Sequence, residues 1–330
     1  MNLPQGVILL ATICNTVGVA SAFALWLSDG EQQYVVDLSD HMQGSGGLTG
    51  IAFHDGRIYV AVQSARSRIL VLDLGLRVVD EIQNDNFNDL HSLHIAGGAL
   101  FIVSTRNGRL LKHDLATGNT SVIAEFDPAA WVSGVHCWPD DLWLCCHEVW
   151  RLDPNAQGGG VYSVGRGRKV LDGLLRPHSL IRYRDGSVVL DSGNARVVYF
   201  DYDGINRVCQ LRGFPRGVAV AGEATLLVAS GPHRTISRKN PVSAAGKGFR
   251  DVAYERLNIF EVTHGELIRT FLPELPGFEI YDMLVLSANA ALRPADDRVI
   301  RLEQGMFARL YYVALVDAML RLSGAPAKPQ

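Results

Sequence analysis

The stretch LRPHSLIRYRDGSVVLDSGNARVVYFDYDG, residues 175–204, determines how the rest of the sequence is interpreted. Two alternating apolar runs flank the pair Asp185 and Gly186, an arrangement typical of a β-hairpin. Further strands are predicted at RVVYFDYDG (196–204) and NRVCQLRG (206–213). Four short strands within about 40 residues are typical of one blade of a β-propeller.

The start of this unit recurs along the chain as a variable residue, a small residue and an aliphatic residue. The copies are LTGIAF, LHSLHI, VSGVHC, PHSLIR, PRGVAV and YDMLVL. By subtraction the copies are 42, 42, 45, 38 and 66 residues apart, and the variable residue is in turn Thr49, His91, Ser133, His178, Arg216 and Asp282. Six copies predict an all-β protein in which residues 1–300 form a six-bladed β-propeller.

The N-terminus supplies strands that the last copy lacks. Three strands that belong to none of the other copies are predicted at 7–13, 21–27 and 33–38. Pairing them with the last copy would close the ring and cover open sheet edges. Residues 1–22 have a second interpretation as a signal peptide, because the segment is apolar and contains VASA. No Lys or Arg precedes the apolar run, and Asn15, Thr16 and Gly18 interrupt it, which favours strands.

Composition excludes several classes of function. With 31 basic and 34 acidic residues the net charge is -3, which argues against a nucleic-acid partner. The five cysteines are odd in number and irregularly spaced, unlike the cysteines of a disulfide framework, which indicates reduced thiols. We therefore expect a cytoplasmic protein, or an exported one if residues 1–22 are a signal peptide. No P-loop, dinucleotide fingerprint or nucleophile elbow is present, so we expect no nucleotide cofactor.

Residues 175–204 resemble an NHL repeat, with Pro-His-Ser, a Gly turn, Asp-Ser-Gly, Arg-Val and Phe-Asp in order. The longer run from PHSL through RGFPRGVAV to FEIYDMLVL also resembles an uncharacterised family of bacterial propellers. The resemblance implies a propeller fold, and no activity is established for that family.

The variable residues of alternate copies predict a metal site. The first strand of each blade lines the central channel, and alternate blades are about 120° apart, so His91, His178 and Asp282 are expected to converge. Two imidazoles and a carboxylate suit Zn²⁺ or Fe²⁺. NHL-type peptide-amidating lyases hold zinc with histidines from alternating blades, and His91 and His178 match two of those positions. Asp282 departs from the third, for which Glu279 is the substitute.

The 66-residue spacing predicts an insertion over the same end of the channel. It spans 230–256 and carries His233, Arg234, Arg238 and Lys239 among other basic residues. We expect this segment to bind a small anionic substrate as a lid, with Arg216 below it as a clamp. A solvated loop is the alternative. Thr49 and Ser133 are expected to orient the substrate.

These features predict a metal-dependent lyase, hydrolase or isomerase acting at the channel mouth. A non-haem iron centre that reacts with oxygen is a second hypothesis, and a non-catalytic propeller that binds a ligand or peptide is a third. Polar lining of a water-filled channel explains the histidines without any function. Residues 301–324 are predicted to be a helix that packs on the propeller or forms a homodimer contact, followed by a disordered tail at 325–330. No membrane span is expected.

Overall fold

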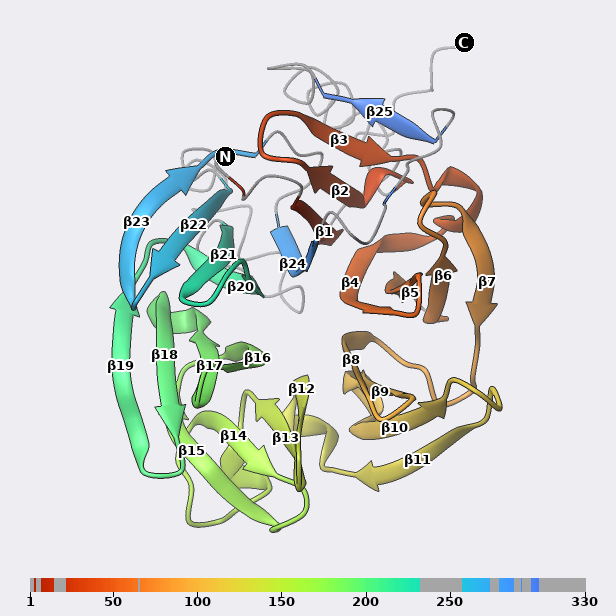
Figure 1. Ribbon diagram of the computed structural model, residues 1–330. Helices are drawn as coiled ribbons and strands as arrows, with labels where there is room; N and C mark the ends of the chain where they lie inside the picture. The colour runs from red at the N-terminus through yellow and green to blue at the C-terminus, as the bar shows by residue number, and fades with distance from the viewer. Residues whose placement is uncertain are drawn as a thin grey trace, which may run out of the picture.

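The computed structural model describes residues 3, 7–14, 22–64, 66–231, 257–273, 279–287, 292 and 298–302. This part of the chain is all-β, with antiparallel sheets and only short 3-10 turns as helix. The sheets stand around a central axis like the blades of a propeller (Figure 1). The predicted all-β propeller architecture is therefore confirmed.

Four of the sheets have four strands each and follow one another along the chain. They contain β8 (Leu90–Ala96), β9 (Ala99–Ser104), β10 (Arg109–Asp114) and β11 (Thr120–Glu125); β12 (Val132–Trp138), β13 (Asp141–Cys146), β14 (Gly159–Ser163) and β15 (Arg168–Leu174); β16 (Pro177–Tyr183), β17 (Gly186–Asp191), β18 (Arg196–Asp201) and β19 (Gly204–Gln210); β20 (Phe214–Val220), β21 (Thr225–Gly231), β22 (Asn258–Thr263) and β23 (Glu266–Phe271). In each of them the first strand lies nearest the axis (Figure 1).

The remaining strands come from the two ends of the chain and the segment after the N-terminus. They are β1 (Ile8–Cys14), β2 (Leu25–Ser28), β3 (Gln33–Val36), β4 (Ser45–His54), β5 (Arg57–Ser64), β6 (Arg68–Leu72), β7 (Val78–Ile82), β24 (Glu279–Leu286) and β25 (Val299–Arg301). Strand β1 pairs with β2 on one side and with β24 on the other, and β3 pairs with β25. A single residue pair, Cys14 and Gly47, links β1 to β4 and joins all nine strands into one sheet.

Short 3-10 turns connect some strands. They are η2 (Ser39–His41), η3 (Thr105–Asn107), η4 (Pro128–Ala130), η5 (Val149–Arg151) and η6 (Ser192–Asn194). Arg301 and Leu302 begin the predicted C-terminal helix, but Arg301 lies in β25 and the Leu302 amide donates to the Gln33 carbonyl at 2.8 Å. The rest of the predicted helix, 303–324, and the predicted tail, 325–330, lie outside the described residues. Within the described ranges no helix is long and apolar enough to cross a membrane.

The apolar residues of the alternating runs pack between neighbouring sheets. Trp143 of β13 stacks on Phe200 of β18 with ring centroids 5.9 Å apart, and the two side chains are 0% and 1% exposed. Removing a large apolar side chain from water stabilises the fold by about 1.5–3 kcal/mol. Contacts of this kind between successive sheets hold the inner strands in fixed positions around the axis.

The small residue of each repeat is explained by close approach of neighbouring inner strands. A Cβ atom at Gly50 would lie 2.6 Å from the backbone nitrogen of Leu93, and one at Gly217 would lie 3.1 Å from Ile280 Cγ2. Where the small residue is serine, its hydroxyl bonds to the next inner strand: Ser92 Oγ accepts a hydrogen bond from the Val135 amide at 3.3 Å. This position therefore fixes the spacing between blades.

Candidate functional site

The last copy of the repeat is in a different register from the one we predicted. Asp282 Oδ2 accepts a hydrogen bond from the Ile51 amide at 3.2 Å, which matches the bond that Ser92 accepts from Val135. Asp282 therefore occupies the small-residue position of its repeat. The variable position, equivalent to His91 and His178, belongs to Tyr281.

Thr49 and Ser133 do not face the mouth of the channel. Thr49 Oγ1 donates to the Leu90 carbonyl at 2.6 Å, and Ser133 Oγ donates to the Pro177 carbonyl at 2.9 Å. In each case the acceptor lies in the next inner strand, and both serine and threonine are fully or almost fully buried. These positions support a role in holding sheets together, and they do not support the predicted role in orienting a substrate.

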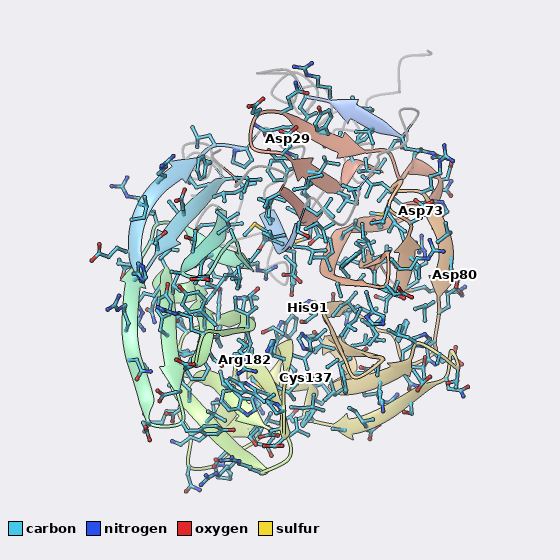
Figure 2. All side chains as sticks on the ribbon, in the orientation of Figure 1. Asp29, Asp73, Asp80, His91, Cys137 and Arg182 are labelled. Atoms are coloured by element: carbon cyan, nitrogen blue, oxygen red, sulfur yellow. The ribbon has the colours of Figure 1, made fainter. Side chains whose placement is uncertain are left out.

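The structure brings His91 and His178 together around Tyr281. The ring centroids of His91 and Tyr281 are 5.3 Å apart, and those of His178 and Tyr281 are 6.5 Å apart. All three side chains are at least 96% buried. Figure 2 shows His91 beside the central axis, far from Asp73 and Asp80 at the periphery. The predicted convergence of alternate blades thus holds for the two histidines, with tyrosine in the third place.

Hydrogen bonds fix the protonation of the His178 ring. Its Nδ1 lies 2.9 Å from the Arg176 carbonyl oxygen and 2.9 Å from Ser192 Oγ. Because a carbonyl oxygen only accepts, Nδ1 carries the proton in the neutral ring and Nε2 has the lone pair. His147 Nε2 lies 3.2 Å from that atom and donates to it. His178 therefore presents a basic nitrogen in a set direction.

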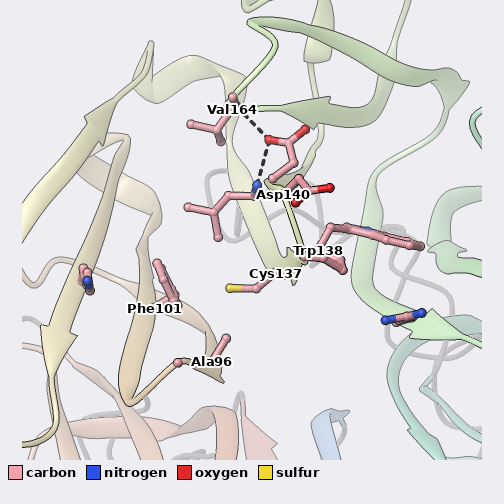
Figure 3. A pocket seen from close by; sticks show the side chains of 13 residues that line it. Ala96, Phe101, Cys137, Trp138, Asp140 and Val164 are labelled. Carbon is pink, nitrogen blue, oxygen red and sulfur yellow. Dashed lines mark hydrogen bonds between the residues drawn. The ribbon is translucent and has the colours of Figure 1, made fainter.

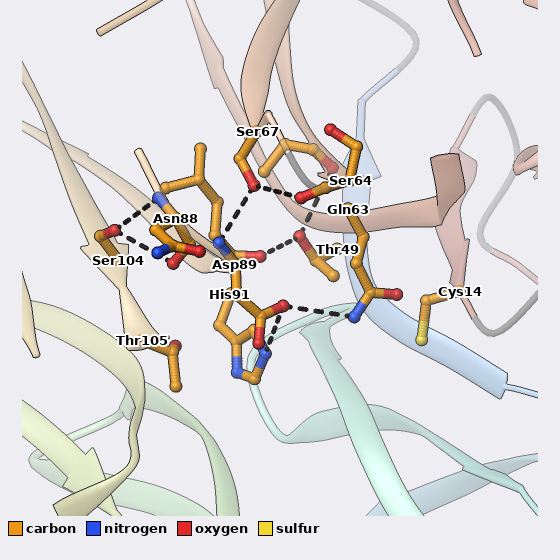
Figure 4. A network of polar contacts seen from close by, with 12 residues as sticks. Cys14, Thr49, Gln63, Ser64, Ser67, Asn88, Asp89, His91, Ser104 and Thr105 are labelled. Atoms are coloured by element: carbon orange, nitrogen blue, oxygen red, sulfur yellow. Dashed lines mark hydrogen bonds and ion pairs between the residues drawn. The ribbon is translucent and has the colours of Figure 1, made fainter. Parts of the chain in front are cut away.

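His91 lies in a polar network on the other side of the cluster. Its Nε2 is 3.5 Å from Asp89 Oδ1, which also faces Gln63 Nε2 at 3.5 Å (Figure 4). No group of the described residues forms a hydrogen bond with His91 Nδ1 or with the Tyr281 hydroxyl, although both atoms are buried. Buried polar atoms in proteins normally have a partner, so these two are candidates for ligand or water contacts.

Arg216 is paired with an acid. Its Nε lies 2.6 Å from Glu279 Oε1, and both side chains are more than 90% buried. The guanidinium also lies over the Tyr281 ring, with Cζ 4.7 Å from the centroid, and one of its terminal nitrogens is 4.0 Å from Cys14 Sγ. The predicted clamp residue is therefore at the site, but Glu279 balances its charge, and Glu279 is not available as a substitute metal ligand.

The predicted set of metal ligands does not fit this geometry. The Asp282 carboxylate accepts hydrogen bonds from the Ile51 and Met283 amides, at 3.2 and 2.9 Å. Burial raises the pKa of Asp282 to about 7, whereas the two amides act in the opposite direction. Among the described residues no three His, Cys, Asp or Glu side chains form a group that could hold a metal ion.

Behind His91 and Tyr281 the inner strands enclose a cavity of about 120 Å³. Asp282, His94 and His136 also line it. The His94 and His136 rings are 4.3 Å apart, and burial lowers their pKa values to about 4 and about 3. A cavity of this size holds about four waters, so it is a polar space beside the cluster.

The cluster contains aromatic residues that the repeat pattern did not identify. Trp131 lies 6.1 Å from the His91 ring and stacks on His147, and Phe214 lies 5.5 Å from the His178 ring. Each stands two positions before a variable residue of the repeat, so comparing that position between copies would have found them. The predicted substrate-binding residues His233, Arg234, Arg238 and Lys239 lie outside the described residues.

Comparison with known sequences gives one family match and no function. Residues 145–292, less than half of the chain, match a family described as a domain of unknown function (DUF4915). A search of curated proteins by sequence finds no match.

Solved structures are similar in three dimensions. A chain of a nidogen/laminin complex has a TM-score of 0.60 at 14% identity, over 88% of this chain and 100% of that one. A protein of unknown function from Bacteroides caccae has a TM-score of 0.57 at 12% identity, over 85% and 99%. A virginiamycin B lyase from Staphylococcus aureus has a TM-score of 0.48 at 13% identity, over 73% and 74%. At these identities, the first two similarities show a shared propeller fold and nothing about activity.

Proposed function

We propose that the cluster of His91, His178, Arg216 and Tyr281 binds a small molecule and catalyses proton transfer on it. The observation that carries this proposal is the His178 ring, whose Nδ1 is held by a carbonyl and a hydroxyl so that Nε2 is basic. A general base needs a set tautomer and a set direction, and a buried site supplies both. Once a substrate displaces the hydrogen bond from His147, His178 Nε2 takes a proton from a substrate carbon or from water, which is the first step of lyase, isomerase or hydrolase chemistry.

Tyr281 and His91 complete this proposal. The buried Tyr281 hydroxyl can donate to an oxygen that becomes negative during the reaction, and His91 Nδ1 can hold a polar group of the same ligand. Burial raises the pKa of Tyr281 well above its usual value, so that the hydroxyl keeps its proton near neutral pH. A protonated phenol in a low-dielectric site is an effective donor to an oxyanion.

Arg216 would recognise an anionic group of the substrate. Of its five N–H donors, one faces Glu279 and one faces Cys14, which leaves donors for a carboxylate or phosphate. Because Glu279 balances the charge, the preference for an anion depends on hydrogen bonding at Arg216. We therefore propose a small substrate with one anionic group.

A thermal-shift and NMR screen of small carboxylic acids and phosphate monoesters tests this function. We expect a ligand that stabilises the protein, is converted by it, and is bound but not converted by Tyr281→Phe and His178→Gln. Ser187→Ala is the control, because Ser187 is buried in β17 away from the cluster. A ligand that is held at the cluster and never converted would overturn catalysis in favour of a binding propeller.

The second candidate is metal-assisted chemistry, which one distance favours. The 3.2 Å between His147 Nε2 and His178 Nε2 is close to the separation of about 3.3 Å between two nitrogen ligands of tetrahedral zinc. A zinc or iron ion held by these two residues would act as a Lewis acid. Metal analysis of the purified protein distinguishes the candidates: near-stoichiometric metal that is lost in His147→Ala and in His178→Ala supports this one.

We also infer that the ring has six blades and is closed by the N-terminal strands. The pairing of β24 with β1, and of β1 with β2 and β3, supports a sixth blade made from both chain ends. Deletion of residues 1–14 tests this inference, because loss of the central strand of that blade should abolish cooperative unfolding.

A further inference from the structure

A second pocket lies at the opposite end of the inner strands from the histidine cluster. In β8 the cluster residue His91 is second, and Ala96, the last residue, lines the pocket. Five residues of an extended strand separate these ends by about 17 Å. The volume of the pocket is about 700 Å³, within the range of about 300–1,000 Å³ that is typical of small-molecule sites.

The walls of the pocket combine apolar surface with two cations. Phe101, Trp138 and the thiol of Cys137 supply the apolar part (Figure 3). Lys112 enters from β10 and Arg182 from β16, and both side chains are exposed. Among the described residues neither cation has a carboxylate within 4.0 Å, unlike Arg216 at the other end of the channel. Arg182 instead lies over the Trp138 ring, with Cζ 5.3 Å from the centroid.

Two acidic residues also line the pocket, and one of them is engaged within its own hairpin. Asp141 uses its carboxylate inside its own hairpin, where it accepts hydrogen bonds from the Leu142 and Gly165 amides at 2.8 Å and from Trp143 Nε1 at 3.1 Å. Asp140 is exposed in the turn between β12 and β13. The groups that remain available to a ligand are therefore two cations and the Asp140 carboxylate, beside an aromatic and aliphatic wall.

We propose that this pocket is a second binding site, for a small molecule with a flat apolar body and one anionic group. The body packs against Phe101 and the edge of Trp138, and the anionic group bonds to Lys112 and Arg182. The site is independent of the proposed acid–base function, because it shares none of the residues of the histidine cluster.

The probe for this site is 1-anilinonaphthalene-8-sulfonate, a flat aromatic sulfonate whose fluorescence rises on binding. We expect one saturable site in the full chain. Lys112→Gln and Arg182→Gln should each weaken binding about tenfold, because a hydrogen bond to a charged group is worth a factor of this order or more. Cys137→Phe should abolish binding by filling the pocket, and circular dichroism checks that each variant is folded.

Two controls keep the result specific. Arg57→Gln removes an exposed cation beside the equivalent turn of another sheet and should leave binding unchanged. N-phenyl-1-naphthylamine, which lacks the sulfonate, should bind at least tenfold more weakly than the sulfonate. Several weak sites, or one site whose affinity is unchanged by the substitutions of Lys112, Arg182 and Cys137, would overturn the proposal. His178→Gln should leave binding of the probe unchanged.

Discussion

Replacing Asp282 with asparagine tests how the buried carboxyl group of Asp282 makes the stability of the fold depend on pH. Asp282 faces the cavity behind the cluster and accepts two backbone hydrogen bonds. Burial raises its pKa to about 7 in the folded protein, whereas an aspartate in an unfolded chain has a pKa of about 3.9. The folded state therefore prefers the protonated carboxyl group.

The size of the effect follows from this difference. About three pKa units at about 1.4 kcal/mol each give a limit of about 4 kcal/mol, and water in the cavity reduces this to about 2–4 kcal/mol. Because the pKa is raised on folding, the stabilising contribution is complete below about pH 4 and is lost as the pH rises through about 7. Asparagine does not titrate, but it can accept only one of the two amide bonds, which costs about 1 kcal/mol at every pH.

Urea denaturation between pH 3.5 and pH 8.5 measures this prediction. We expect Asp282→Asn to be less stable than the wild type at pH 3.5 and more stable at pH 8.5, so that the two curves cross between these values, near the pH at which the wild type has lost about 1 kcal/mol. Ser92→Ala removes the equivalent hydrogen bond in another blade without a titrating group, and its curve should run parallel to the wild type. An Asp282→Asn curve that is also parallel would refute the argument, because the carboxyl group would then not be titrating in this range.

Three further predictions concern the packing around the axis. Thr49→Val should cost about 1–3 kcal/mol of unfolding free energy, because a buried carbonyl loses its donor, and it should leave ligand binding at the cluster unchanged. Glu279→Gln should cost about 3–5 kcal/mol by leaving Arg216 buried and unpaired, whereas the double variant with Arg216→Met should recover part of that loss in chemical denaturation. Gly50→Ala should lower the melting temperature more than Gly134→Ala, because the new Cβ meets backbone at 2.6 Å in the first case and a side-chain Cβ at 3.2 Å in the second; equal shifts would contradict this reading.

The propeller architecture could be predicted because the sequence features that specify it lie within short segments of the chain. Alternating apolar runs, glycine turns and the repeat of a variable, a small and an aliphatic residue are each visible within a few residues. The small position is constrained by backbone contact between neighbouring inner strands, so that glycine, serine or aspartate marks it in every copy. That constraint allowed His91 and His178 to be placed at equivalent positions from the sequence.

The composition of the site was less predictable because it depends on pairs of residues from different blades. A register error of one residue exchanged Tyr281 for Asp282, since both precede an apolar run and aspartate also suits the small position. The ion pair between Arg216 and Glu279 joins residues that are 63 positions apart by subtraction, and no local pattern indicates it. The hydroxyls of Thr49 and Ser133 donate to backbone carbonyls of the next blade. Because every residue has a backbone carbonyl, the sequence does not indicate which one accepts the bond.

The pairing of β1 with β24 has a consequence for biosynthesis. Ile8 pairs with Leu286, so their partnership spans 278 residues by subtraction. While the ribosome makes the intervening chain, β1 has an uncovered edge of main-chain amides and carbonyls, which is a template for unwanted association. We therefore expect nascent chains that stop before β24 to depend on chaperones, and full-length chains to become independent of them once β24 has emerged.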